Sequence, residues 1–87
     1  MVIERFLRGA APVYERAAEQ GRMLPAGLEY VDSWIDERDL SRCFQLMETD
    51  DVALLQRWVA EWSDLVTFEI VPVVSGKETA EALGPEL

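Results

Sequence analysis

The sequence predicts a single α+β domain in which two strand–helix units follow one another, so that the elements run β-α-β-β-α-β. Residues 41–71 carry the strongest signal, because they read as strand, helix and strand with almost no loop between them. A weaker unit of the same kind precedes them. The length of 87 residues matches one domain, and a chain this short often gains stability by forming oligomers.

The first unit is expected to contain a strand, a helix and a second strand. Residues 1–7 and 28–36 show the alternation typical of strands. Between them, Pro12 suits the first turn of a helix over residues 12–20, because its fixed φ fits and its missing N–H has no partner there. Gly21 suits the position just after that helix. The inner stripe of the helix is expected to contain Val13 and Ala17, with Tyr14 and Ala18 beside them.

The second unit repeats this order with a clearer helix. Residues 42–49 are predicted to form the third strand, and Asp50 or Asp51 to cap the following helix, because an acid favours the positive end of a helix dipole. That helix should end near residues 62–63. Its apolar stripe has the spacing i, i+3, i+4, i+7 and consists of Leu55, Trp58, Val59 and Trp62.

The chain is expected to end with an edge strand and a short helix. The last strand is predicted over residues 67–74, and Pro72 places it at an edge of the sheet or in a bulge, because proline cannot donate a ladder hydrogen bond. Residues 77–83 could form a third helix within a C-terminal helix or tail over residues 76–87. One domain is therefore predicted over residues 1–87.

Right-handed crossovers would place both long helices on one face of a four-stranded antiparallel sheet, the ferredoxin-like arrangement. Alternation along the strands then predicts that the helices cover an uncharged set consisting of Ile3, Val31, Ile35, Phe44, Leu46, Phe68 and Ile70. The opposite face would carry Phe6, Tyr30, Trp34, Cys43, Met47, Val71 and Val73, interleaved with Glu4, Asp32, Gln45 and Glu69. A register change of one residue would exchange Glu4 with Arg5, so the face that Glu4 takes stays open.

The apolar content of that opposite face predicts an assembly. A solvated sheet face is mostly polar, and a large exposed apolar patch usually marks an interface or a ligand site. We therefore expect a homodimer in which two sheets face each other and enclose a cavity. A small apolar or aromatic molecule would bind there, in contact with Phe6, Tyr30, Trp34, Cys43, Gln45 and Met47.

Three acids are candidates for catalysis in such a cavity. A carboxylate in a partly apolar cleft has a raised pKa and can accept or donate a proton, which applies to Glu4, Asp32 and Glu69. Alternatively, these acids pair with arginines or lie in water at the rim, since ion pairs are also common causes of shifted pKa values. Tyr30 and Trp34 could stack on a planar ligand or anchor the dimer interface.

Composition excludes several classes of function. The net charge is −9, from 17 acidic and 8 basic residues, so nucleic acid and anionic membranes are unfavourable partners. There is no histidine and only one cysteine, which removes the usual zinc sites, haem ligation by histidine and the histidine-dependent nucleophile pairs. No metal and no cofactor are expected. Charges near the amino end argue against a signal peptide, and a cytoplasmic location is expected.

The chain resembles the short proteins grouped as domain of unknown function 3303. The matching features are the early VIERF strand, PAGLEYVDSW, RCFQLMETDD, the pair Trp58 and Trp62 followed by WSDL, and FEIVPVV, which together cover about residues 2–75. The resemblance implies a ferredoxin-like subunit of the dimeric α/β-barrel superfamily that dimerises through its sheet. It implies no activity.

Three functions remain open at this point. The protein could be a binding module with a ligand between two sheets. It could be a cofactor-independent enzyme, similar to the monooxygenases or isomerases of that superfamily, with a cavity carboxylate as base. It could also be a pure interaction protein with a dry interface. Cavity volume separates the first two from the third, because a site for a drug-sized ligand needs about 300 Å³ or more.

Overall fold

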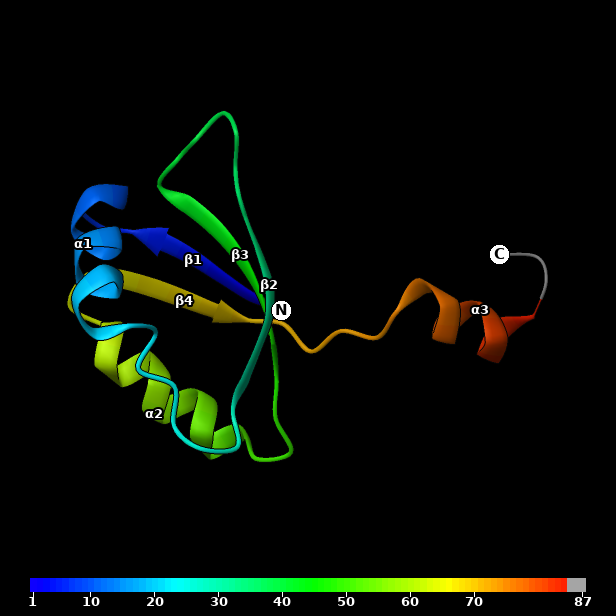
Figure 1. Ribbon diagram of the computed structural model, residues 1–87. Coiled ribbons are helices and arrows are strands. Elements are labelled where there is room, and N and C mark those ends of the chain that lie inside the picture. The colour runs from blue at the N-terminus through cyan, green and yellow to red at the C-terminus, as the bar shows by residue number, and fades with distance from the viewer. Residues whose placement is uncertain (85–87) are drawn as a thin grey trace.

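The computed structural model describes residues 1–84 and has the predicted β-α-β-β-α-β order followed by a third helix (Figure 1). The elements are β1 (Val2–Phe6), α1 (Ala10–Gln20), β2 (Glu29–Ile35), β3 (Arg42–Glu48), α2 (Val52–Trp62), β4 (Val66–Ile70) and α3 (Gly76–Leu83). The tail predicted to the end of the chain includes residues 85–87, which lie outside the described residues.

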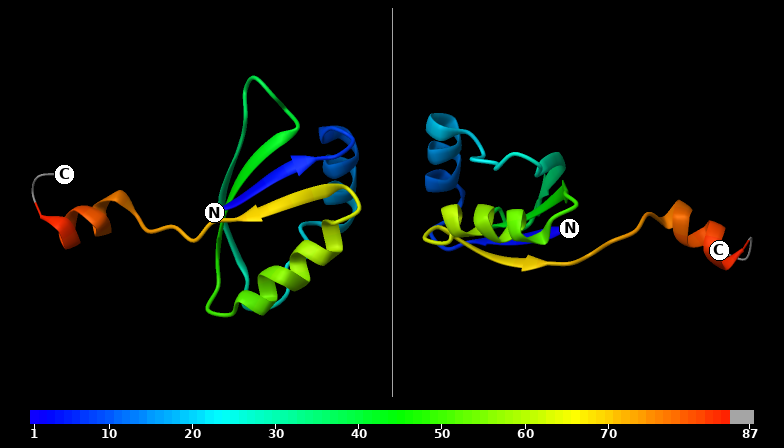
Figure 2. Two further views of the ribbon diagram at one scale, coloured as in Figure 1. Left: turned by 180° about the vertical axis from the view of Figure 1, so that it is seen from behind. Right: turned by 90° about the horizontal axis from the view of Figure 1, so that it is seen from below.

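The four strands form one antiparallel sheet in the order β2-β3-β1-β4. Both α1 and α2 lie on the same side of this sheet, as the views in Figures 1 and 2 show. This is the predicted ferredoxin-like α+β fold. The strand order also places β4 at an edge, where Pro72 can follow without interrupting a central ladder. The strand itself ends at Ile70, so the prediction that it continues to residue 74 was wrong.

The helices cover the opposite set of side chains from the one predicted on β1 and β3. On β1, Val2, Glu4 and Phe6 are buried, and on β3 the buried residues are Cys43 and Gln45. The predicted inner residues of these strands, Ile3, Phe44 and Leu46, lie on the other face. Alternation separates two sets of side chains but does not say which set meets the helices. Both sets contain large apolar groups here, so hydrophobicity did not decide between them.

A bulge in β2 divides the face on which Tyr30, Asp32 and Trp34 were predicted to lie together. Tyr30 pairs with Met47, whereas Asp32 pairs with Leu46, and the register shifts between Tyr30 and Asp32. One extra residue in a strand reverses the facing of everything after it. Tyr30 therefore lies on the helix side, and Trp34 lies on the outward side with half of its surface exposed. Val31, predicted to be inside, is also half exposed.

The predictions for β4, α2 and the end of β2 are better supported. Trp58 and Trp62 are buried, and the ring of Phe68 meets the ring of Trp58 edge to face with 5.5 Å between centroids. Ile35 packs against the same core. Asp51 caps α2, because its side chain accepts a hydrogen bond of 2.9 Å from the N–H of Ala53. Ile70, however, is exposed at the end of β4.

The first helix lies over the sheet more loosely than the second. It begins at Ala10, two residues before the predicted start, and Pro12 still occupies its first turn. No side chain within Ala10–Gln20 is fully buried. Arg16 holds the helix to the end of α2 through two hydrogen bonds to the carboxylate of Asp64, of 2.8 and 2.6 Å. Its guanidinium also lies 5.5 Å from the ring centre of Trp62.

The third helix forms where a short helix was predicted, but it does not pack on the sheet. In Figure 1 it lies on the right, while α1 and α2 lie on the left of the strands. Among the helices described, none is long and apolar enough to cross a membrane.

Candidate functional site

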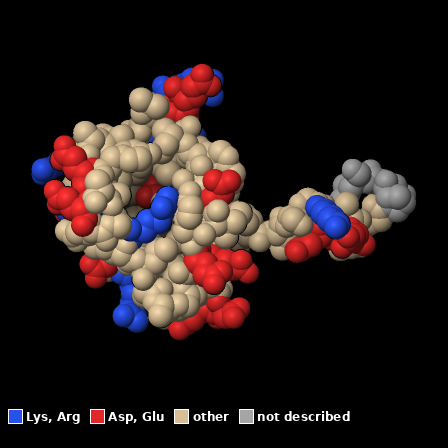
Figure 3. Space-filling model, in the orientation of Figure 1, with Lys and Arg blue, Asp and Glu red and all other residues tan. Residues whose placement is uncertain are grey.

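A cavity of about 390 Å³ lies between α1, α2 and the helix-facing side of the sheet. Figure 3 shows an opening to this interior, with an acidic group deep inside and a basic group at its rim. The cavity has two charged residues, Glu4 and Arg22, among rings, small apolar side chains and a few neutral polar groups. Its lining consists of Glu4, Phe6, Val13, Tyr14, Ala17, Ala18, Arg22, Ser33, Cys43, Gln45, Trp58 and Trp62.

Glu4 occupies the floor of the cavity because it sits in the middle of β1, a central strand, and points toward the helices. Only 4% of its surface is exposed. The side-chain amide of Gln45 donates a hydrogen bond to Oε2 of Glu4. Burial raises the pKa of Glu4 above its ordinary value, and hydrogen bonds from Gln45 and Cys43 and the positive charge of Arg22 oppose that rise only in part.

Cys43 lies beside this acid, because it is the cross-strand partner of Glu4 in the pairing of β1 with β3. Burial, followed by the negative charge of Glu4, raises the pKa of the Cys43 thiol to about 12. The thiol therefore stays protonated at neutral pH and acts as a hydrogen-bond donor to the acid. A nucleophilic role would need a thiolate, which this environment disfavours.

Arg22 forms the rim, and two indole rings fix its backbone. The carbonyl oxygen of Arg22 accepts hydrogen bonds from Nε1 of Trp58, at 2.9 Å, and from Nε1 of Trp62, at 3.0 Å. Gly21, with φ of 67°, ends α1 just before it and turns the chain toward α2. The tryptophan pair, predicted to pack the core, thus also anchors the loop that follows α1.

The side chain of Arg22 then reaches over the sheet. Its guanidinium carbon lies 3.5 Å from the ring centre of Tyr30, a cation–π contact. Its Nε donates to Oε1 of Gln45 at 3.5 Å. Gln45 accepts from Arg22 on one side and donates to Glu4 on the other, so one chain of hydrogen bonds joins the rim to the floor. Each bond fixes the orientation of the next group.

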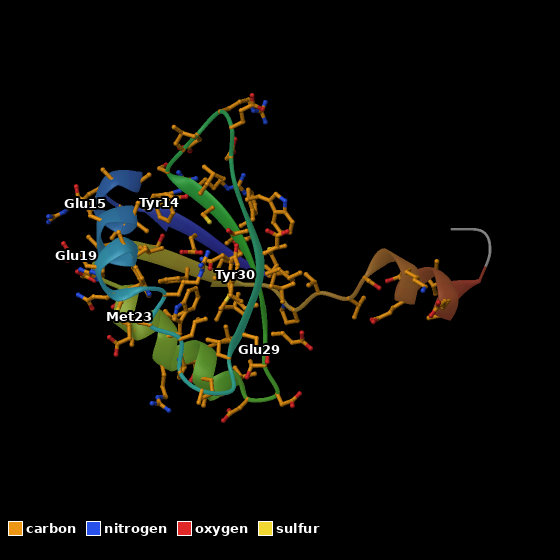
Figure 4. All side chains as sticks on the ribbon, in the orientation of Figure 1. Tyr14, Glu15, Glu19, Met23, Glu29 and Tyr30 are labelled. Atoms are coloured by element: carbon orange, nitrogen blue, oxygen red, sulfur yellow. The ribbon has the colours of Figure 1, made fainter. Side chains whose placement is uncertain are left out.

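The mouth of the cavity is lined by two further polar residues. Tyr14 projects from the side of α1 that faces the sheet, whereas Glu15 and Glu19 project away from it (Figure 4). More than half of Tyr14 is exposed although it lines the cavity. Across the opening, the hydroxyl groups of Ser33 and Tyr30 are 2.8 Å apart and hydrogen-bonded.

The structure brings together some of the predicted site residues and separates others. Glu4, Phe6, Cys43 and Gln45 line the cavity. They do so beneath the chain's own helices, so their predicted position on the outward face was wrong. Tyr30 contacts Arg22 at the edge of the cavity, and Met47 packs against the core.

Trp34, Asp32 and Glu69 lie on the outward face, away from the cavity. Asp32 and Trp34 are paired with outward-facing residues of β3. Glu69 lines a second hollow of about 260 Å³ together with Arg5 and Arg42. These three residues therefore cannot act on a molecule bound beneath α1. In residues 1–84, no group of three or more acidic, cysteine or histidine side chains could hold a metal ion.

Sequence reasoning missed Arg22, Ser33 and the tryptophan hydrogen bonds. Arg22 belongs to a segment that reads only as a loop, RMLPAG, and nothing in its composition points to a binding role. Ser33 faces the cavity only because of the bulge in β2. The one available signal was the polar edge of Trp58 and Trp62, since a buried indole N–H usually has an acceptor.

The comparisons with known proteins identify a family but no reaction. The whole chain, residues 1–87, matches the family described as "Domain of unknown function (DUF3303)". The chain belongs to this family. The resemblance predicted from the motifs is thereby confirmed at the level of the family, while membership of the dimeric α/β-barrel superfamily stays a prediction. No curated protein and no solved structure matches the chain significantly.

Proposed function

We propose that this DUF3303 protein binds a small aromatic molecule in the cavity beneath α1. The observation that carries the proposal is the cavity itself. Its volume of about 390 Å³ falls in the range of roughly 300–1,000 Å³ typical of small-molecule sites. Phe6, Trp58 and Trp62 supply rings that can stack on a planar ligand.

The two charged residues define how such a ligand would be oriented. Arg22, at the rim, suits a carboxylate or another anionic group, because a guanidinium offers paired N–H donors. Glu4, at the floor and held by Gln45, suits a hydroxyl or N–H group that donates a hydrogen bond. The ligand class that fits best is therefore an aromatic acid whose ring enters the cavity and whose anionic group stays at the rim.

Two simple molecules test this orientation. Benzoate and benzylamine share an aromatic ring but carry opposite charges. In NMR titrations of the protein, benzoate should shift the indole N–H signals of Trp58 and Trp62 and bind more tightly than benzylamine. Tighter binding of benzylamine would contradict the assignment of Arg22 as the anion-binding group.

Matched variants separate the cavity from the rest of the surface. Ala17 lines the cavity, so Ala17→Leu should fill part of it and weaken benzoate binding, whereas Ala60→Leu, on an exposed position of α2, should not. Arg22→Gln should also weaken benzoate binding, while Arg57→Gln, an exposed arginine of α2, serves as its control. Equal effects of a variant and its control would exclude the cavity as the binding site.

The geometry also favours a second candidate function, proton transfer by Glu4 without a cofactor. A buried carboxylate at the floor of an aromatic cavity is a stronger base than one in water once it is ionised, and its raised pKa brings that ionisation closer to neutral pH. Gln45 would orient the acid, and Tyr14 and Ser33 are hydroxyl donors at the mouth. The predicted candidates Asp32 and Glu69 do not contribute, because they face outward.

Ring opening of 5-nitrobenzisoxazole is a suitable probe for this second function. A base removes the proton on carbon 3, the N–O bond breaks, and 2-cyano-4-nitrophenolate is released and measured by its absorbance. Proton transfer by Glu4 predicts turnover that is lost in Glu4→Gln and kept in Glu69→Gln. Turnover no faster than that of free acetate at the same pH would leave the protein as a binding module only.

We further propose that the protein assembles as a homodimer through the outward face of the sheet. The support differs from the original expectation, because Phe6, Cys43 and Met47 are not on that face. It carries instead the apolar residues Ile3, Trp34, Phe44 and Leu46. Light scattering at micromolar concentration tests this: a dimer is expected, with Trp34→Asp shifting it toward monomer. A stable monomer of the unaltered protein would contradict the proposal.

A further inference from the structure

The chain leaves the body of the protein after β4. Residues 71–75 contain no helix or strand, and α3 follows them. Figures 1 and 2 show α3 standing clear of the sheet, on the side away from α1 and α2. Three apolar side chains of this part are largely exposed, Val73 at 52%, Val74 at 71% and Leu83 at 66%. Val71 is still held to the body, because its backbone exchanges two hydrogen bonds of 2.7 Å with Met1. We call residues 72–84 the C-terminal arm.

The helix of the arm is specified by its own sequence. Ser75 caps it, since Oγ of Ser75 accepts a hydrogen bond of 2.9 Å from the N–H of Glu78. Gly84, with φ of 96°, ends it, and its N–H bonds to the carbonyl of Ala80 at 2.8 Å. An isolated helix of eight residues is nevertheless marginal in water, because nucleation is costly. Ala80 and Leu83, three residues apart, form a short apolar stripe on one side of this helix. Packing of that stripe on another surface would stabilise the helix.

The outward face of the sheet offers such a surface in the same chain. The outward face of the sheet exposes half of Trp34 and parts of Ile3, Phe44 and Leu46. In Figures 1 and 2 the arm runs on past the end of β4, away from α1 and α2 and clear of the strands. The four residues between Val71 and α3 and the eight helical residues span roughly 25 Å. This length is about three quarters of the 33 Å second dimension of the molecule, so the arm can extend over much of a second copy seated on that face.

We propose that the C-terminal arm clasps a second copy of this chain, with the exposed stripe of α3 and Val73 and Val74 packed on the partner. The inference rests on the dimer proposed above and adds a second contact to it. A two-fold axis makes the exchange reciprocal, so both arms are used and the assembly closes. A single copy leaves the arm and the outward face uncovered together, and one partner covers both.

Mixed-label NMR tests the exchange directly. A nitroxide spin label is attached through Glu81→Cys, on the charged side of α3, which leaves the apolar stripe intact. The native Cys43 is buried with a pKa of about 12 and should not be labelled. The spin-labelled protein is unfolded and refolded together with ¹⁵N-enriched protein that carries no spin label. Any broadening of ¹⁵N signals then arises from a spin label on another copy. The proposal predicts broadening at outward-facing residues of the ¹⁵N copy and none from a matched label introduced through Glu19→Cys on α1.

Weakened assembly provides a second measurement. Val74→Asp and Leu83→Asp should each weaken the dimer about tenfold or more in sedimentation analysis, because each places a charge in an apolar contact. Lys77→Gln, which leaves the stripe unchanged, is the control. A dimer that shows no broadening and unchanged affinity in both variants would overturn the arm exchange and leave the sheet-mediated dimer standing. A monomer overturns the exchange and the dimer together, whereas benzoate binding inside the subunit is measured separately.

Discussion

Replacing Trp58 and Trp62 by phenylalanine, singly and together, tests how the mouth of the cavity is held. The carbonyl oxygen of Arg22 accepts hydrogen bonds of 2.9 and 3.0 Å from the two indole N–H groups. Either substitution removes one donor and leaves the other in place. Only the double substitution removes both donors from this partly buried carbonyl. The two effects on stability should therefore not add.

The expected magnitudes follow from this geometry. Each single variant loses one hydrogen bond, about 1 kcal/mol, and some apolar area, roughly another 1 kcal/mol or less. The double variant also leaves the carbonyl without a protein partner, which costs a further ~1–3 kcal/mol to the extent that water cannot reach it. For a domain of this size, 1 kcal/mol corresponds to a change in Tm of roughly 4–8 °C.

Urea unfolding of the four proteins gives the coupling free energy as a double-mutant cycle. We expect the double variant to lose at least about 1 kcal/mol more than the sum of the two single losses. Benzoate affinity should fall with it, because the backbone that carries Arg22 is no longer anchored. Additivity within about 0.5 kcal/mol, with unchanged benzoate affinity, would refute the role of the indole pair in holding Arg22.

Three further predictions concern single residues. Burial raises the pKa of Glu4 above 4.5, so the folded protein binds this proton more tightly than the unfolded chain does. Stability should therefore fall as pH rises from the unfolded-state pKa of Glu4 to its folded-state pKa. Urea unfolding of Glu4→Gln should show less of this fall, and a pH profile identical to that of the unaltered protein would contradict the raised pKa. With its pKa at about 12, the Cys43 thiol should not react with 5,5′-dithiobis(2-nitrobenzoate) at pH 8 until the protein is unfolded. Rapid reaction of the folded protein would contradict the burial of this thiol. Gly27→Ala should destabilise by about 1–3 kcal/mol, because φ is 94° and the new Cβ would lie 2.9 Å from Cδ1 of Leu54; Gly76→Ala, which meets no atom, should not destabilise in the same thermal scans.

Much of the fold was predictable because local signals agreed with one another. An acid at position 50 or 51 as a helix cap, the stripe with Trp58 and Trp62, and Pro72 as the sign of an edge strand were predicted on physical grounds, and the structure agrees with each. The facing of β1 was not predictable in this way. Both faces of β1 carry apolar residues, Val2 and Phe6 on one and Ile3 on the other. Glu4 shares a face with Val2 and Phe6, and its charge argued against burial of that face. The buried set was the one containing Glu4, because Gln45 and Cys43 satisfy that acid across β3.

Several residues of the candidate site were predicted from the sequence, but the side of the sheet on which they lie was not. Glu4 and Gln45 were selected as polar groups among apolar ones, and they do lie together. Their location beneath α1 depended on the facing of two strands. Arg22 could not be selected, because its role comes from two hydrogen bonds to tryptophans 36 and 40 residues away in the chain. Contacts at such separation leave no periodic pattern in a sequence.

Nuclear Overhauser effects between benzoate and the three tryptophans test the central claim most directly. Trp58 and Trp62 line the cavity beneath α1, and Trp34, the remaining tryptophan of the chain, lies on the outward face. A cavity that binds aromatic acids beneath α1 predicts effects from the benzoate ring protons to the indoles of Trp58 and Trp62, and none to Trp34. Effects confined to Trp34 would show that the ligand binds on the outside of the sheet and that the proposed site is wrong.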